Sequence, residues 1–318
     1  MKQDRAPLIL LITLAVILIG GLWTPQWAAF LITVALAKGL VVLGLLPQMR
    51  AGLISFGQAL YYCIGAYAGG SLGRFLGVTD IIAMIVVGGL AAALAAFAFG
   101  FLLAKYRAIF YGLLSLALSM ILYGLLVKTE SLGSTDGFNV APFTLFGTRP
   151  SAEWVRYVLL AVTAIVACGA GLGMQRYLQT PLGQLAHAMR DNEIRVEYMG
   201  ASARYAIHVK YVIGALLAGM GGALVAAAVG HIDPEMSYWT MSGEFIFIGV
   251  LAGTGSVVAP FLGAIIFASI HSFAFDVSPN TWQMVLGTSL LLVIVFLPEG
   301  LWSLFKRKSA ATRAAGAG

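Results

Sequence analysis

Residues 81–104 read IIAMIVVGGLAAALAAFAFGFLLA, a run of 24 residues that contains no charged side chain. A helix of about 20 apolar residues is long enough to cross a hydrocarbon core about 30 Å thick. Similar runs recur along the chain, in which 60% of the residues are hydrophobic and 10% are charged. Because soluble domains carry about a quarter charged residues, the composition excludes a soluble globular protein and predicts an all-α polytopic membrane protein.

The hydropathy pattern predicts nine apolar segments, the first of which is similar to a secretory signal peptide. Lys2 and Arg5 precede its apolar run, but no small-x-small cleavage site follows, so we expect it to remain as the first membrane span. The nine segments are residues 8–23, 27–46, 53–77, 81–104, 108–127, 154–174, 209–230, 241–271 and 282–304.

The orientation follows from the 19 Lys and Arg residues. With the N-terminus inside, fourteen of them fall on the inner side and four on the outer side, while Lys38 lies within a span. Cytoplasmic loops are typically rich in positive charge. We therefore expect a multi-pass protein of the bacterial inner membrane with both termini in the cytoplasm, a periplasmic loop at 128–153 and a cytoplasmic tail at 306–318.

The segment 241–271 is 31 residues long and is interrupted by Ala252-Gly253-Thr254-Gly255-Ser256. Two cytoplasmic termini require an even number of crossings, so we expect two half-helices that fold back at this break. The prediction is about eight full transmembrane helices plus a re-entrant hairpin. Non-helical backbone at membrane depth is tolerated where it is buried in protein or lines a polar cavity. The break is therefore a candidate for the solute pathway, or else a packing kink.

Residues 175–208 form the most informative polar loop, which we place in the cytoplasm. Its part 180–200 reads TPLGQLAHAMRDNEIRVEYMG. Thr180 is a plausible N-cap, Pro181 suits the first helical position and Gly200 suits the end of the helix. Apolar residues at helical spacing, Leu182 to Ile194, predict one or two short amphipathic helices. Such a helix docks in a groove of a soluble partner or lies on the membrane surface, and its acidic residues favour a protein partner.

Several motifs in this order resemble those of branched-chain amino-acid ABC transporter permeases. The resemblance covers roughly residues 30 to 305, and the central motif is the cytoplasmic coupling region of that family. The motifs are Gly52–Gln58, Thr135–Gly137, Gly183, Arg190-Asp191-Asn192-Glu193, Gly200, Ala218–Ala223, Gly253–Ser256 and Phe296–Leu301. Gln58 stands where the family often has His, Ala252 where it has Gly, and Lys38 where relatives are usually uncharged, which bears on the substrate more than on the class of transporter.

The resemblance implies that residues 1–318 form a single permease domain with the ABC importer permease fold. The implied partners are a second permease subunit in a heterodimer, two cytoplasmic ABC ATPases and a periplasmic solute-binding protein, with no cofactor and no nucleic acid. The sequence has no G-x-x-x-x-G-K-[ST] phosphate-binding loop, so ATP hydrolysis is expected from a separate subunit and the chain is not expected to be an enzyme. The coupling residues implied are Gly183, Arg190, Asn192, Glu193 and Gly200.

Candidate pathway residues combine hydrogen-bonding groups, an intramembrane charge and the glycines of the break. They are Ser55, Gln58, Tyr61, Glu244, Gly253 and Gly255. Intramembrane charges are usually functional or paired, so Glu244 and Lys38 have either a pathway role or a structural one, and Ser55, Gln58 and Tyr61 could equally join helices. The solute is expected to be a branched-chain amino acid, or else urea, an amide or another small organic acid.

Two other classes of protein stay open on the sequence alone. An ATP-independent secondary transporter or channel typically shows inverted repeats and buried ion-coupling residues, and neither is evident here. A membrane enzyme is the second alternative, but the four histidines are scattered and form no H-E-x-x-H motif. No catalytic residue and no metal ligand is therefore predicted.

Overall fold

The computed structural model describes residues 6–151, 153–277, 282–296 and 300–303, and this part of the chain is a bundle of helices. The α-helices are α1 (Ala6–Gly20), α2 (Gln26–Arg50), α3 (Gln58–Phe75), α4 (Ile81–Leu103), α5 (Ala108–Val127), α6 (Val155–Gln179), α7 (Pro181–Tyr198), α8 (Ala203–Val229), α9 (Trp239–Ala252), α10 (Ala259–Val277) and α11 (Trp282–Phe296). The short elements are η1 (Glu130–Leu132), η2 (Ser134–Asp136), β1 (Phe138–Asn139), β2 (His231–Ile232) and η3 (Pro234–Ser237).

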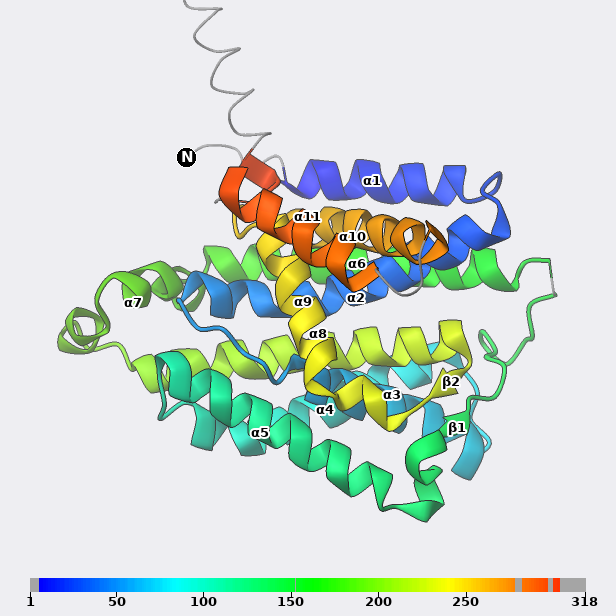
Figure 1. Cartoon of the computed structure of the whole chain (residues 1–318), viewed down its shortest axis with the longest axis horizontal. Helices are drawn as coiled ribbons and strands as arrows, with labels where there is room; N and C mark the ends of the chain where they lie inside the picture. The colour runs from blue at the N-terminus through cyan, green and yellow to red at the C-terminus, as the bar shows by residue number, and fades with distance from the viewer. Residues whose placement is uncertain (1–5, 152, 278–281, 297–299, 304–318) are drawn as a thin grey trace, which may run out of the picture.

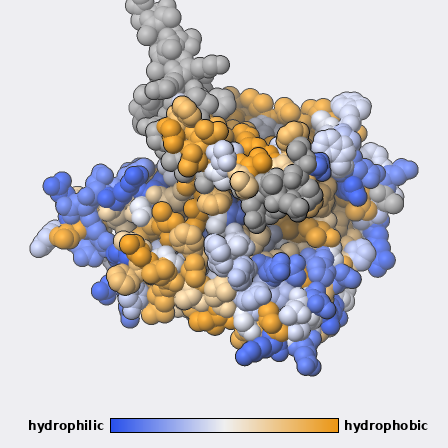
Figure 2. Space-filling model, viewed as in Figure 1, coloured by the Kyte–Doolittle hydropathy of each residue, from blue (hydrophilic) through white to orange (hydrophobic). Residues whose placement is uncertain are grey.

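Most of the long helices lie along the longest axis of the molecule, with α7 at one end and the β1–β2 pair at the other (Figure 1). Six of the described helices, α2, α4, α5, α6, α8 and α10, are long and apolar enough to cross a membrane. α1 and α9 are shorter apolar helices. Figure 2 shows the hydrophilic residues gathered mainly at the two ends of this axis and hydrophobic residues across the middle. This arrangement confirms the predicted polytopic membrane protein.

Both described ends of the chain lie at the α7 end of the bundle, since α1 begins there and the last described residues return to it (Figure 1). This agrees with an even number of crossings. Which end faces the cytoplasm stays a prediction from the charge distribution. The predicted tail at 306–318 and residues Leu297–Glu299 of the closing motif lie outside the described residues.

Helix α8 occupies the centre of the bundle and packs against α2, α3 and α4. Glycine pairs bring the backbones close together at these crossings. A Cβ atom at Gly44 would lie 2.5 Å from the carbonyl oxygen of Gly214, and one at Gly219 would lie 2.5 Å from that of Gly88. Since small residues allow such close packing in lipid, these crossings explain why glycine occupies these positions.

Three helices extend further toward the α7 end than their apolar segments predict. α2 continues to Arg50, α6 continues to Gln179, and α8 begins at Ala203. The extra turns contain Arg50, Arg176 and Arg204. Hydropathy marks the edge of the apolar region, whereas a helix continues past it for as long as its backbone hydrogen bonds are formed.

The interrupted segment 241–271 does break, but not into two half-helices. α9 has 14 residues and ends at Ala252, directly before Gly253, which has φ +80°, a conformation that favours glycine. α10 has 19 residues and is long enough to span, so the prediction of two short halves was wrong for the second part. α9 runs obliquely to the other helices (Figure 1). The segment predicted at 53–77 also differs, because residues 53–57 are not helical and α3 begins only at Gln58.

Candidate coupling and translocation sites

Helix α7 is built by the local signals that the sequence contains. The Thr180 hydroxyl accepts a hydrogen bond from the backbone N–H of Gly183 at 3.3 Å, and Pro181 occupies the first turn. Asn192 is extended, with φ −161° and ψ 100°. The helix therefore consists of two short segments, a first one before Asn192 (residues 181–191) and a second one after it (residues 193–198), which Met199 follows. The side-chain oxygen of Asn192 accepts from the N–H of Arg195 at 2.9 Å and caps the second segment. Gly200, with φ +85°, follows its end.

The first segment of α7 is fastened to α8. Gly183, Ala186 and Met189 are buried on its inner face. The ammonium group of Lys210, a fully buried residue of α8, donates to the carbonyl oxygen of Leu182 at 3.0 Å. A charged hydrogen bond of this kind contributes about 1.5–3 kcal/mol. The N-terminal part of α7 therefore has a fixed position on the bundle.

The second segment presents apolar side chains to solvent. Ile194 is 67% exposed, Tyr198 88% and Met199 80%. The prediction that Ile194 belongs to the inner stripe was wrong: Val196, seven residues after Met189 and so on the same helical face, is the buried residue of the second segment. This segment projects from the end of the bundle (Figure 1) and forms an apolar spot within a hydrophilic surface (Figure 2).

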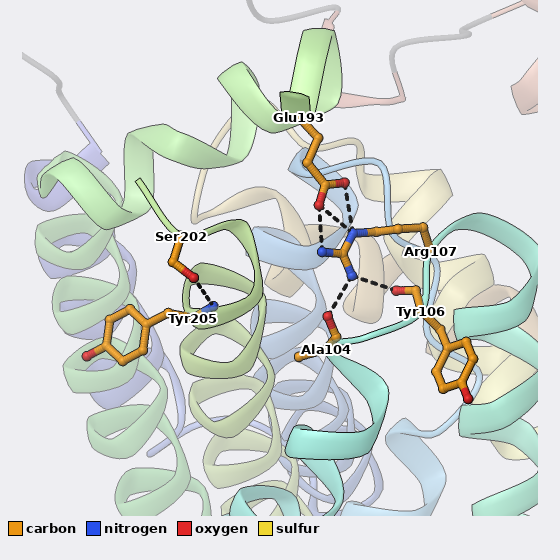
Figure 3. Close-up of polar contacts among 6 residues, drawn as sticks. All are labelled: Ala104, Tyr106, Arg107, Glu193, Ser202 and Tyr205. Carbon is orange, nitrogen blue, oxygen red and sulfur yellow. Dashed lines mark hydrogen bonds and ion pairs between the residues drawn. The ribbon is translucent and has the colours of Figure 1, made fainter. Parts of the chain in front are cut away.

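Glu193 joins α7 to the turn between α4 and α5 (Figure 3). Its carboxylate accepts two hydrogen bonds from Nε of Arg107, each at 2.8 Å, and one from Nη2 at 2.6 Å. The same guanidinium donates to the carbonyl oxygens of Ala104 at 2.7 Å and Tyr106 at 2.9 Å. No signal in the sequence indicated this pairing, because Arg107 counted there only as a charge that sets orientation. Arg190 is exposed on α7.

Polar side chains of four helices meet inside the bundle, and two predicted pathway residues belong to this cluster. The hydroxyl of Tyr61 (α3) donates to that of Tyr211 (α8) at 2.7 Å, and the hydroxyl of Tyr111 (α5) donates to Gln48 (α2) at 2.9 Å. Gln58 is buried beside them, and its amide has no hydrogen-bond partner among the described residues. The two hydrogen bonds among Tyr61, Tyr211, Tyr111 and Gln48 join these four helices inside the bundle.

Ser55 also lies within the bundle, but in the non-helical segment before α3. It is fully buried, and its hydroxyl accepts from the N–H of Gly57 at 3.3 Å. The N–H of Ala59 donates to the hydroxyl of Ser242 on α9 at 3.1 Å. The start of α3 is therefore bonded to α9 and lies next to the polar cluster.

Glu244 on α9 pairs with Lys38 on α2. The distance from Lys38 Nζ to Glu244 Oε1 is 2.6 Å, and the two side chains are 21% and 19% exposed. The sequence left each charge with an unidentified partner, and the structure brings the two together. Both residues line a cavity of about 610 Å³.

Gly253 and Gly255 lie at the break between α9 and α10, apart from the Lys38–Glu244 pair. Nε of Arg50, at the end of α2, donates to the carbonyl oxygen of Thr254 at 2.9 Å. A Cβ atom at Gly255 would lie 2.7 Å from a ring carbon of Trp302, and the N–H of Leu301 donates to the carbonyl oxygen of Leu251 at 2.9 Å. The break is thus packed against α2 and the last described residues, and its part in a solute pathway stays a prediction.

This combination of a membrane-spanning bundle, a polar interior and a projecting two-segment helix at one end is that of a membrane transport component. A sequence model of the family described as the permease component of branched-chain amino acid transport systems matches residues 27–295. The chain belongs to this family, as its resemblance to branched-chain amino-acid ABC permeases predicted.

Curated relatives agree with this assignment. The chain is 29% identical over 294 residues to the high-affinity branched-chain amino acid transport system permease protein LivM of Escherichia coli, which covers 85% of this chain and 68% of the relative. The match to LivM of Salmonella typhimurium has the same identity and coverage. The permease protein BraD of Pseudomonas aeruginosa is 27% identical over 151 residues, or 47% of this chain and 48% of the relative. No solved structure matches the chain.

Proposed function

We propose that this chain forms half of the translocation pathway of an ABC importer in the bacterial inner membrane, with both termini in the cytoplasm. A second permease subunit completes the pathway, two ABC ATPases dock from the cytoplasm, and a periplasmic binding protein delivers the solute. The names of the relatives support branched-chain amino acids as the solute. The ATPases hydrolyse ATP, and the permease chain itself does not.

The observation that carries the proposal is the division of α7 into a fastened and an exposed segment. The first segment is held by Lys210, while the second presents Ile194, Tyr198 and Met199 to solvent. Exposed aromatic and Met side chains are typical of protein interfaces. We therefore assign the second segment, together with Arg190, to the contact with the ATPase.

Glu193 and Asn192 have a different part in this scheme. Asn192 sets the angle between the two segments, and Glu193 connects them to the α4–α5 turn through Arg107. A displacement of α7 by the ATPase would therefore move α5 through this ion pair and the core through Lys210. Gly183 and Gly200 allow the close packing and the turn at the two ends of α7.

The test replaces the exposed side chains in the assembled transporter. Tyr198→Ala with Met199→Ala is expected to lower the affinity for the ATPase about tenfold or more, because exposed aromatic anchors typically contribute over 1 kcal/mol. Co-purification of the ATPase and ATP-dependent uptake in proteoliposomes measure the effect. Phe146→Ala, which removes an aromatic side chain 79% exposed in the loop between α5 and α6, is the matched control.

Two results would contradict the proposal. One is normal ATPase association and uptake by the double variant. The other is uptake by the reconstituted permease without nucleotide, which would favour the ATP-independent transporter or channel. Glu193→Ala is expected to reduce uptake and ATPase association while membrane insertion stays normal.

A further inference from the structure

The Lys38–Glu244 ion pair lies within the membrane-spanning part of the bundle. Lys38 is the thirteenth residue of the 25-residue α2, and Glu244 is the sixth residue of α9. Charges within a bilayer are costly and typically face a cavity or a partner. This pair does both, because each side chain contacts the other and is about one fifth exposed.

Two cavities meet at this pair. The first, of about 610 Å³, is lined by Lys38, Glu244 and residues of α2 and α10. The second, of about 830 Å³, is lined by Lys38 and residues of α2, α3, α5, α8 and α9. Val34, one helical turn before Lys38, lines both. Sites for small molecules typically have about 300–1,000 Å³, so either cavity has room for an amino acid.

The walls of the first cavity are mainly apolar, although Arg156, His271 and Asp276 also line it, whereas the second is more polar and is also lined by Asp233 and Glu235. Phe30 and Phe267 line the first cavity, and Met120 and Val225 line the second. In the first cavity, a cation and an anion in contact beside a mainly apolar wall complement a ligand that has one ammonium group, one carboxylate and an apolar side chain.

We infer that Lys38 and Glu244 form a binding site for a zwitterionic amino acid with an apolar side chain. The solute carboxylate takes the place of Glu244 on the Lys38 ammonium, and the solute ammonium takes the place of Lys38 on the Glu244 carboxylate. The exchange leaves each charge paired, so neither is left isolated in a low-dielectric environment, which would be strongly unfavourable. This inference rests on the proposed function and adds to it the residues that recognise the solute.

The first experiment separates recognition from structure in the full reconstituted transporter with its binding protein. Lys38→Met with Glu244→Gln removes both charges, and Lys38→Glu with Glu244→Lys exchanges them and keeps an ion pair. We expect ATP-dependent uptake of L-leucine to fall about 10–100-fold in both, the range for loss of a charge-assisted hydrogen bond, while the complex assembles normally. Lys128→Met, which removes an exposed charge beyond α5, is the control for a change of charge alone.

Uptake at the wild-type rate by the exchanged pair would overturn the inference, because an ion pair with a purely structural role works in either direction. A zwitterion bound in reverse would point its side chain away from the apolar wall. Loss of uptake in the exchanged variant despite normal assembly supports the site.

The second experiment needs no ATP. Val34→Cys is introduced after replacement of the two buried cysteines, Cys63 and Cys168, by Ala. We expect L-leucine to protect this position from a thiol reagent, whereas leucinamide and N-acetyl-leucine do not. When Lys38→Met and Glu244→Gln are also present, protection should need at least a tenfold higher leucine concentration, the effect of losing a charged contact.

Equal protection by all three compounds, or no protection by leucine, would overturn the inference. A wild-type transporter that shows no ATP-dependent uptake but keeps selective protection at Val34→Cys would overturn the proposed function and leave the site standing. The two failures are therefore distinguishable.

Discussion

Two ion pairs among the described residues, Lys38–Glu244 and Arg107–Glu193, have the same shortest distance of 2.6 Å and similar exposure, yet their surroundings differ. Arg107 makes further hydrogen bonds to two carbonyl oxygens and lies at the end of the bundle, where water is an alternative partner. Lys38 lies midway along α2 and lines a cavity with mainly apolar walls. The free energy that an ion pair contributes depends on the groups, water or apolar side chains, that surround each charge once the pair is broken. The contact distance alone does not indicate this free energy.

The largest difference is expected when one partner is removed. Glu244→Ala leaves Lys38 without its carboxylate. Loss of one member of a fully buried pair costs about 3–5 kcal/mol. Because these side chains are about one fifth exposed, we expect a somewhat smaller fall in the free energy of unfolding, measured by denaturant titration of the purified chain in nanodiscs.

The rescue by Lys38→Met tests whether the penalty comes from the isolated charge. The double variant should recover most of the lost stability, since it leaves no unpaired ion. If Glu244→Ala alone costs no more than Glu193→Ala, the contrast between the two ion pairs is wrong.

Lys210 is a third case, because it is more fully buried than Lys38 and donates to backbone carbonyl oxygens in place of a carboxylate. Lys210→Met keeps the length of the side chain and leaves the carbonyl of Leu182 without this donor. An unsatisfied buried group costs about 1–3 kcal/mol.

The effect should be local to α7. We expect faster hydrogen exchange at residues 182–190 and unchanged exchange in α4, measured by mass spectrometry. Arg204→Met, an exposed residue of the same helix, is the matched control. Unchanged exchange in α7 would show that its buried apolar face suffices to hold it.

The sequence predicted those features that depend on neighbouring residues. The cap at Thr180, the turn at Gly200 and the break at Gly253 follow from local backbone chemistry, and the membrane class follows from hydropathy. The contacts between distant residues were not predictable in the same way. Lys38 and Glu244 are 206 positions apart and Arg107 and Glu193 are 86 apart, so only the packing of helices brings them together.

Ile194 shows a second limit of the sequence. Its spacing of eight from Ala186 fits a helical stripe, but an Asn at position 192 can cap a new helix as well as continue the old one. The structure contains the cap, and the following side chains turn by the angle of the break. Periodicity therefore predicted two amphipathic segments without predicting which residues of the second face the solvent.

The smallest expected effect concerns the Arg107–Glu193 pair itself. About 30% of each side chain is exposed, and exposed pairs typically contribute 0.2–1 kcal/mol. A double-mutant cycle of Arg107→Met and Glu193→Gln should give a coupling energy near the upper end, about 1 kcal/mol, because the contact is bidentate.

Raising the salt from about 0.1 to 1 M shortens the screening length from about 10 to 3 Å, so this coupling should fall by more than half, whereas that between Lys38 and Glu244 should hardly change. Equal salt sensitivity of the two cycles would mean that water and ions reach Lys38 as freely as Arg107, and the distinction between a recognition site inside the membrane and a mechanical link at its surface would then be lost.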